Sequence, residues 1–72
     1  MVLVFTGEKG NSGQFELLLE AFDGSKRVMV VTSTEALEDY GLDAIHGKAS
    51  EKYAAGKLDE RGRVRVLTSD LE

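Results

Sequence analysis

The sequence predicts a small soluble α+β domain: an antiparallel sheet of three or four strands with two helices packed on one face, in the order βββααβ. Three observations predict it. Two strand-like apolar runs flank the dipeptide Asp23-Gly24, a helix start signal follows at Thr32, and a valine-rich strand pattern returns at Arg63–Thr68. A length of 72 residues fits a single domain, 1–72, because chains divide only well above this size.

The first predicted strand is Val2–Phe5, which is apolar and β-branched, and the glycine-rich segment Gly7–Gly13 predicts a loop after it. The apolar runs Phe15–Phe22 and Arg27–Thr32 come next. Asp-Gly between two such runs is a strong β-hairpin signal, because a tight turn needs residues that tolerate positive φ. We therefore predict a two-residue turn at Asp23-Gly24.

With that turn, Leu19 faces Val28, and Glu20 faces Arg27 as an opposite-charge pair. Side chains alternate along strands, so the hairpin and the last strand each have two different faces. The predicted core face holds Phe15, Leu17, Leu19, Val28, Val30, Val64 and Val66. The second face is mixed, and its hairpin residues are Glu16, Leu18, Glu20, Arg27, Met29 and Val31.

A rival interpretation of Phe15–Phe22 stays open. Phe15, Leu18, Leu19 and Phe22 also follow the i, i+3, i+4, i+7 spacing of an amphipathic helix. That pattern would make the fold a βαβ unit. The Asp-Gly turn and the self-consistent register favour the strand.

Thr32-Ser33-Thr34-Glu35 fits a capping box with Thr32 as the N-cap, and Ser33 could serve equally. It predicts a short helix that ends at Gly41.

Asp43 can cap a second helix, which Gly56 would end. The apolar stripe expected on this helix consists of Leu42, Ile45, Ala49 and Tyr53. Glu60-Arg61-Gly62 then predicts a turn into the last strand.

Composition excludes several classes of site. The chain has no cysteine and only one histidine, His46, so a thiolate or multi-histidine zinc site is not expected. The first residues lack a basic start and a long apolar run, and no stretch reaches the ~20 apolar residues of a membrane span. We expect a cytoplasmic protein that needs no cofactor. A net charge of −4 argues against general affinity for nucleic acid.

No catalytic constellation emerges from the sequence. The glycines after the first strand match neither the P-loop nor the dinucleotide-binding spacing. His46 is expected in the first turn of a helix, and Ser12, Ser33 and Ser50 have no assignable activating base. We expect no enzyme, although a small enzyme with a pocket near His46 remains an alternative.

The second sheet face is the candidate site, because two helices can cover only one side of a sheet. Its candidate partner-binding residues are Leu18, Arg27, Met29, Arg63 and Arg65. An apolar patch rimmed by charge is typical of an interaction surface, so we expect a protein-binding or regulatory module, whose partner is an unknown protein or a second copy. The simpler explanation is a set of cross-strand salt bridges between Glu16 or Glu20 and Arg63 or Arg65. Nucleic-acid binding through Arg61, Arg63 and Arg65 is a further alternative.

Several segments resemble the small bacterial proteins of domain-of-unknown-function family 1488. They are Val4–Glu8, Phe22–Gly24, Val31–Gly41, Lys52–Gly56 and Gly62–Leu71, and together they cover most of the chain. The resemblance implies an α+β fold, and it implies no established activity and no site residues. Members of that family often carry a cysteine where this chain has Met29-Val30.

Overall fold

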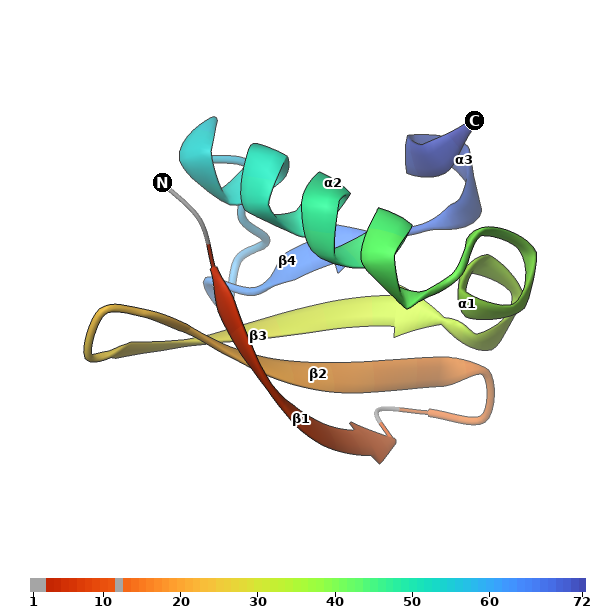
Figure 1. The fold of residues 1–72 in the computed structure, drawn as a ribbon, viewed down its shortest axis with the longest axis horizontal. Coiled ribbons are helices and arrows are strands. Elements are labelled where there is room, and N and C mark those ends of the chain that lie inside the picture. Colours follow the sequence, from red (N-terminus) through yellow and green to blue (C-terminus); the bar gives the residue numbers. More distant parts are fainter. Residues whose placement is uncertain (1–2, 12) are drawn as a thin grey trace.

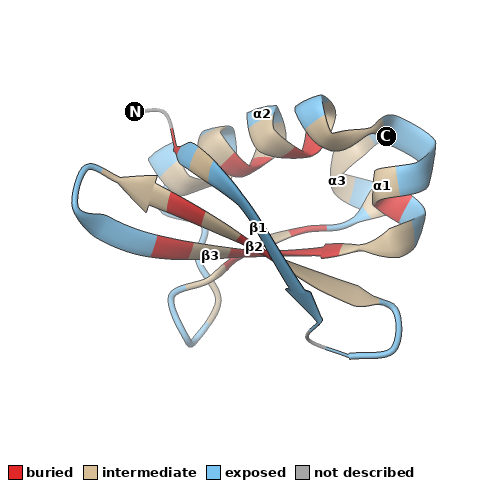
Figure 2. Ribbon diagram, turned by 60° about the horizontal axis from the view of Figure 1, so that its bottom comes forward, coloured by how far each residue is buried: buried red, intermediate tan, exposed pale blue. Residues whose placement is uncertain are grey.

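The fold comes from a computed structural model, which describes residues 3–11 and 13–72 (Figure 1). Its elements are β1 (Val4–Asn11), β2 (Glu16–Asp23), β3 (Lys26–Ser33), α1 (Thr34–Tyr40), α2 (Leu42–Ala54), β4 (Val64–Val66) and α3 (Thr68–Leu71). The predicted α+β class and the order βββααβ are confirmed, and α3 is an addition. Figure 2 shows the helices on one side of the sheet.

The four strands lie in the order β1-β2-β3-β4. β1 pairs with β2, and β2 with β3, in antiparallel fashion, whereas β3 and β4 are parallel. The sheet is mixed, so the prediction of an antiparallel sheet is wrong for the last strand. The reason is the connection: α1 and α2 carry the chain back along the sheet before β4 begins, as a crossover between parallel strands requires.

The Phe15–Phe22 run forms a strand over Glu16–Asp23, so the helical interpretation is wrong. The hairpin turn lies at Gly24-Ser25 and not at Asp23-Gly24. Gly24 has a φ of 63°, which its missing side chain permits. Leu19 consequently faces Val30 instead of Val28. The shift is two residues, which preserves side-chain parity, so the predicted division into two faces is retained.

The first strand is longer than predicted. Val2 lies outside the described residues, and β1 continues through much of the expected Gly7–Gly13 loop. Its pairing with β2 is interrupted once, because Thr6-Gly7-Glu8 lies opposite Glu20 alone. The glycines therefore mark a bulge inside the strand as well as the end of the strand.

The bulge has a local cause. Gly7 adopts a φ of 89°, a conformation that side chains disfavour. The Thr6 hydroxyl accepts a hydrogen bond from the Glu8 amide at 3.2 Å and donates one to Glu20 at 3.0 Å. The first bond gives the Glu8 amide a partner where the strand pairing is interrupted, and the second joins Thr6 to the residue opposite the bulge.

Ser33, not Thr32, caps α1: its hydroxyl accepts a hydrogen bond from the Ala36 amide at 3.0 Å. Gly41 ends that helix with a φ of 86°, as expected. It is also the N-cap of α2, so Asp43 lies in the first turn and the predicted Asp43 cap is wrong. The predicted stop near Gly56 is confirmed, because α2 ends at Ala54.

The core lies between the sheet and the helices. Its buried members are Leu3, Leu19, Ala21, Val28, Val30, Ala36, Ile45, Ala49, Val64 and Val66. The predicted stripe on α2 is confirmed, since Leu42 and Tyr53 pack against this cluster beside Ile45 and Ala49. Two of the expected core residues are not members of this cluster: Phe15 precedes β2 and is 66% exposed, and Leu17 is only partly buried.

The last strand is shorter than the predicted Arg63–Thr68, because Thr68 already begins α3. The Asp70 carboxylate of α3 accepts the Leu67 amide at 2.9 Å and pairs with Lys52 of α2 at 3.0 Å. Lys52 also donates to the Arg65 carbonyl at 2.6 Å. Lys52 of α2 thus bonds to both β4 and α3.

Thr32 points into the core, and its hydroxyl is fully buried with no hydrogen-bond partner among the described residues. A buried hydroxyl without a partner costs folding free energy. We predict that Thr32→Val raises the free energy of unfolding by about 1 kcal/mol in chemical denaturation. The matched control, Val30→Thr, adds a hydroxyl to the same strand face and should lower it by about 1–3 kcal/mol. Destabilisation by Thr32→Val would contradict this explanation.

Candidate functional site

One side of the sheet carries no helix, as the sequence predicted (Figures 1 and 2). We call it the open face and define it by the residues of β2, β3 and β4 that the strand register places there: Glu16, Leu18, Glu20, Phe22, Arg27, Met29, Val31, Ser33 and Arg65. Its two halves differ. The half over β4 is shielded by ion pairs, whereas the half toward β1 is hollowed.

In the shielded half, the Arg65 guanidinium lies 2.9 Å from the Glu16 carboxylate. Arg65 is on β4 and Glu16 is on β2, so their ion pair spans the central strand β3. Val31 of β3 is fully buried although no helix covers it. We attribute this burial to its two strand neighbours, Leu18 and Arg65, and to the spanning ion pair.

Arg63, like Arg65, does not lie in the hollowed half of the open face. Asp59 accepts hydrogen bonds from the Arg63 amide at 2.8 Å, from the Arg63 side chain at 3.0 Å and from the Arg61 amide at 2.9 Å. The Arg63 backbone bond is the main reason that the pKa of Asp59 lies below its usual value. Asp59 also lies 4.0 Å from Arg65. The expected salt bridge between Glu16 and Arg65 is therefore present, and both arginines face carboxylates.

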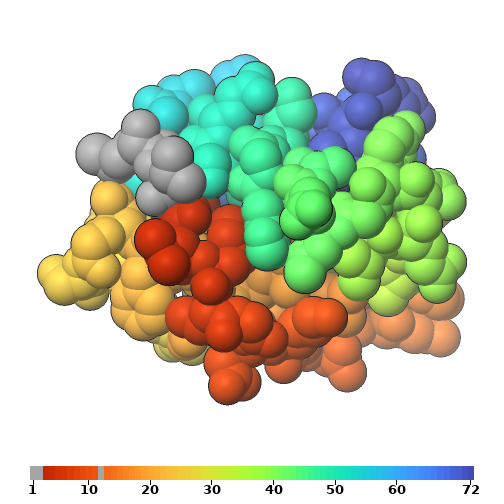
Figure 3. All heavy atoms as spheres, viewed as in Figure 1, coloured from red at the N-terminus to blue at the C-terminus, as the bar shows by residue number. Residues whose placement is uncertain are grey.

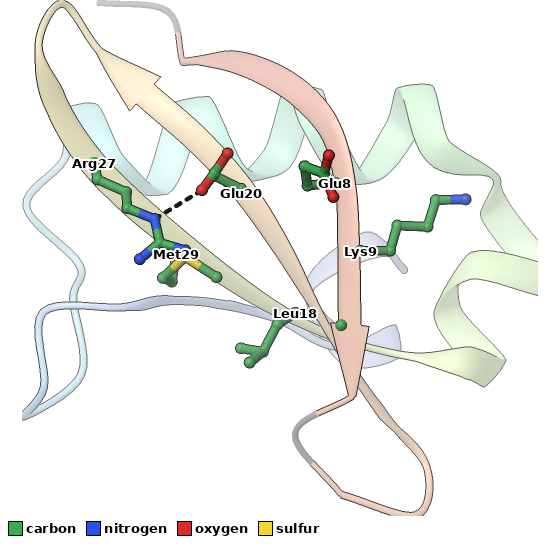
Figure 4. Close-up of a pocket in the computed structure, with 7 residues that line it drawn as sticks. Glu8, Lys9, Leu18, Glu20, Arg27 and Met29 are labelled. Atoms are coloured by element: carbon green, nitrogen blue, oxygen red, sulfur yellow. Dashed lines mark hydrogen bonds and ion pairs between the residues drawn. The ribbon is translucent and has the colours of Figure 1, made fainter.

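The hollow of the open face has a volume of about 380 Å³ (Figure 4). Its lining residues are Glu8, Lys9, Gly10, Leu18, Glu20, Arg27 and Met29. Leu18 and Met29 supply apolar surface, and both are only partly buried. Leu18 pairs with Gly10 of β1, which has no side chain to cover it. The hollow is thus an apolar surface next to charged groups.

The predicted pair of Glu20 and Arg27 is present at 2.8 Å, although the two residues are diagonal neighbours instead of directly opposite. The Arg27 side chain is 61% exposed and the Glu20 side chain 21%. Arg27 therefore retains free surface for contact with another molecule. Figure 4 shows Lys9 pointing away from Leu18.

The structure brings together three of the five predicted site residues, namely Leu18, Arg27 and Met29. Arg63 and Arg65 lie apart from them, bound to Asp59 and Glu16. Sequence reasoning missed the contribution of Glu8–Gly10, because that segment was predicted to be a loop. The signal that could have found it is Thr6-Gly7, a polar residue and a glycine where a bulge would let the strand continue.

His46 lies in a second surface hollow of about 500 Å³, lined by Leu3, Phe5, His46, Gly47 and Ser50. Its ring stacks on Phe5 with a centroid distance of 3.8 Å and an interplanar angle of 8°. The Ser50 hydroxyl accepts the Leu3 amide at 3.2 Å. Figure 3 shows the start of β1 against α2 at this place.

Burial lowers the pKa of His46 below 6.5, and the Asp43 carboxylate opposes that shift. Among residues 3–11 and 13–72, no hydrogen bond orients the imidazole, and no cluster of three or more potential metal ligands exists. The hollow therefore has the concave shape that the enzyme alternative requires and lacks an oriented base.

No family model matches the chain, and neither a curated protein nor a solved structure matches it. The resemblance to family 1488 accordingly remains a hypothesis. In the part of the chain that the structure describes, no helix has the length and apolar character to cross a membrane.

His46 provides a test by pH. Its pKa is lowered in the folded state, so the unfolded chain binds more protons near pH 6 than the folded chain does. We predict that the free energy of unfolding decreases as the pH falls through 6.5 and that His46→Gln reduces this dependence. Denaturation titrations of both proteins between about pH 5.5 and 7.5 measure it. Equal pH dependence in the two proteins would contradict the lowered pKa.

Proposed function

We propose that this chain is a small, non-enzymatic protein-binding or regulatory module that docks a partner protein on the hollowed half of the open face. The observation that carries the proposal is Leu18 and Met29, two large apolar side chains on a sheet face that no helix covers. Methionine adapts to differently shaped partners, and apolar residues beside charged ones are typical of interface cores with polar rims.

The charges favour a protein partner over nucleic acid. Binding to phosphates needs a cationic surface. The open face carries Glu16 and Glu20 as well as Arg27 and Arg65, and the arginines are paired with the glutamates. Arg63 is paired with Asp59. We extend the proposal to a bacterial, cytoplasmic protein, which the resemblance and the composition suggest.

Site-specific photocrosslinking tests the proposal. A photoreactive amino acid replaces Met29, or, as the control, Tyr40, which is 40% exposed on α1 at the helix side. Irradiation in the native cell should join the Met29 variant to one defined protein and leave the Tyr40 variant without that product. Crosslinks identified by mass spectrometry also give the partner's identity. No product from Met29, or the same product from both positions, would contradict the proposal.

A further inference from the structure

We infer that the partner on the open face is a second copy of this chain, related by a twofold axis. This inference rests on the proposed docking face and names its occupant. It is argued from the charge of that face, from the area that a stable interface needs and from the state of the sheet edges.

The open face is electrically neutral, whereas the chain is acidic. Its β2, β3 and β4 residues carry two carboxylates, Glu16 and Glu20, and two guanidiniums, Arg27 and Arg65; the β1 residues that line its hollow, Glu8 and Lys9, add one charge of each sign. The formal charge of −4 therefore lies entirely on the rest of the chain. Two copies approaching by their helix sides would bring net negative charge together, because the helices hold six carboxylates and two lysines, but the open faces meet without that repulsion.

Charge order on the face also suits a twofold contact. In such a contact, the same patch lies on both sides, so each residue must tolerate its counterpart. Glu20 and Arg27 are adjacent and opposite in sign. Two such pairs placed antiparallel bring each arginine near the other copy's glutamate, which makes the patch self-complementary.

Area limits where a dimer could form. A standard interface takes about 800 Å² from each partner. This chain exposes 4476 Å² in all and measures 29 × 23 × 23 Å, so an interface of that size must use a whole face. The helix side is acidic: α1 has Glu35, Glu38 and Asp39, and the lysines of α2, Lys48 and Lys52, are balanced by Asp43 and Glu51. The open face is the neutral alternative.

The sheet edges are poor sites for pairing with another strand. At the β4 edge, Lys52 occupies the Arg65 carbonyl, and the Asp59 amide occupies the Arg63 carbonyl at 2.8 Å. The β1 edge contains a bulge and the charged pair Glu8-Lys9, features that discourage strand pairing. Face-to-face contact is therefore favoured over extension of the sheet.

Complementary charge variants test the inference. Arg27→Glu and Glu20→Arg each put two like charges on the patch, so each variant should raise the dimer dissociation constant about tenfold or more in sedimentation equilibrium at low salt. An equimolar mixture should form the mixed dimer with an affinity close to that of the unchanged protein. Leu18→Lys should weaken the dimer by about tenfold or more, and Tyr40→Lys, which places a lysine on the helix side, by less than about twofold. Thermal unfolding of each variant confirms that it folds.

A protein that is still monomeric at about 1 mM would overturn the inference. Equal effects of Leu18→Lys and Tyr40→Lys, or a failure of the mixture to associate, would overturn it as well. The two proposals fail separately. If the unchanged protein is monomeric and Met29 crosslinks to a different protein, the second copy is wrong and the binding module stands. If Met29 crosslinks to nothing, both are wrong.

Discussion

The antiparallel ladder between β2 and β3 is the constraint on which the rest of the structure depends. It assigns alternate side chains to opposite sides of the sheet, so Leu19 and Ala21 go to the core while Leu18 and Glu20 do not. The helices cover one side only. Every residue on the other side must then be shielded by its neighbours, stay in water or meet another molecule.

Side chains also alternate between the two sides of the sheet along the parallel strand β4. Val64 and Val66 enter the core, and alternation then places Arg65 on the open face. There Arg65 meets Glu16, and Val31 is buried between them and their neighbours. Because both ionic side chains are about 40% exposed, the pair adds little free energy by itself. Its effect is to shield apolar surface. No equivalent pair covers Leu18, since β1 has Gly10 opposite it.

Local sequence signals predicted side-chain parity, the helix stop at Gly41 and the residues on each face. They did not predict the hairpin register, because a turn at either Asp23-Gly24 or Gly24-Ser25 uses the same glycine and keeps the same faces. Non-local contacts distinguish the two registers: the Tyr53 hydroxyl donates to Asp23 at 2.7 Å from a helix thirty residues away. The direction of β4 likewise depends on how α1 and α2 pack, which no local pattern encodes. Of the site, the hairpin residues were predictable by alternation, and Glu8–Gly10 were not, because the bulge made a strand resemble a loop.

Cysteine accessibility measures the central claim, that neighbouring positions of β2 and β3 face different environments. The chain has no cysteine, so single replacements at Leu18, Leu19, Met29 and Val30 each give one thiol to label. Thiols at 18 and 29 should react with a maleimide in the folded protein, more slowly than in an unfolded peptide because both positions are partly buried. Thiols at 19 and 30 should be protected until the protein unfolds. Equal protection of positions 18 and 19 would contradict the account.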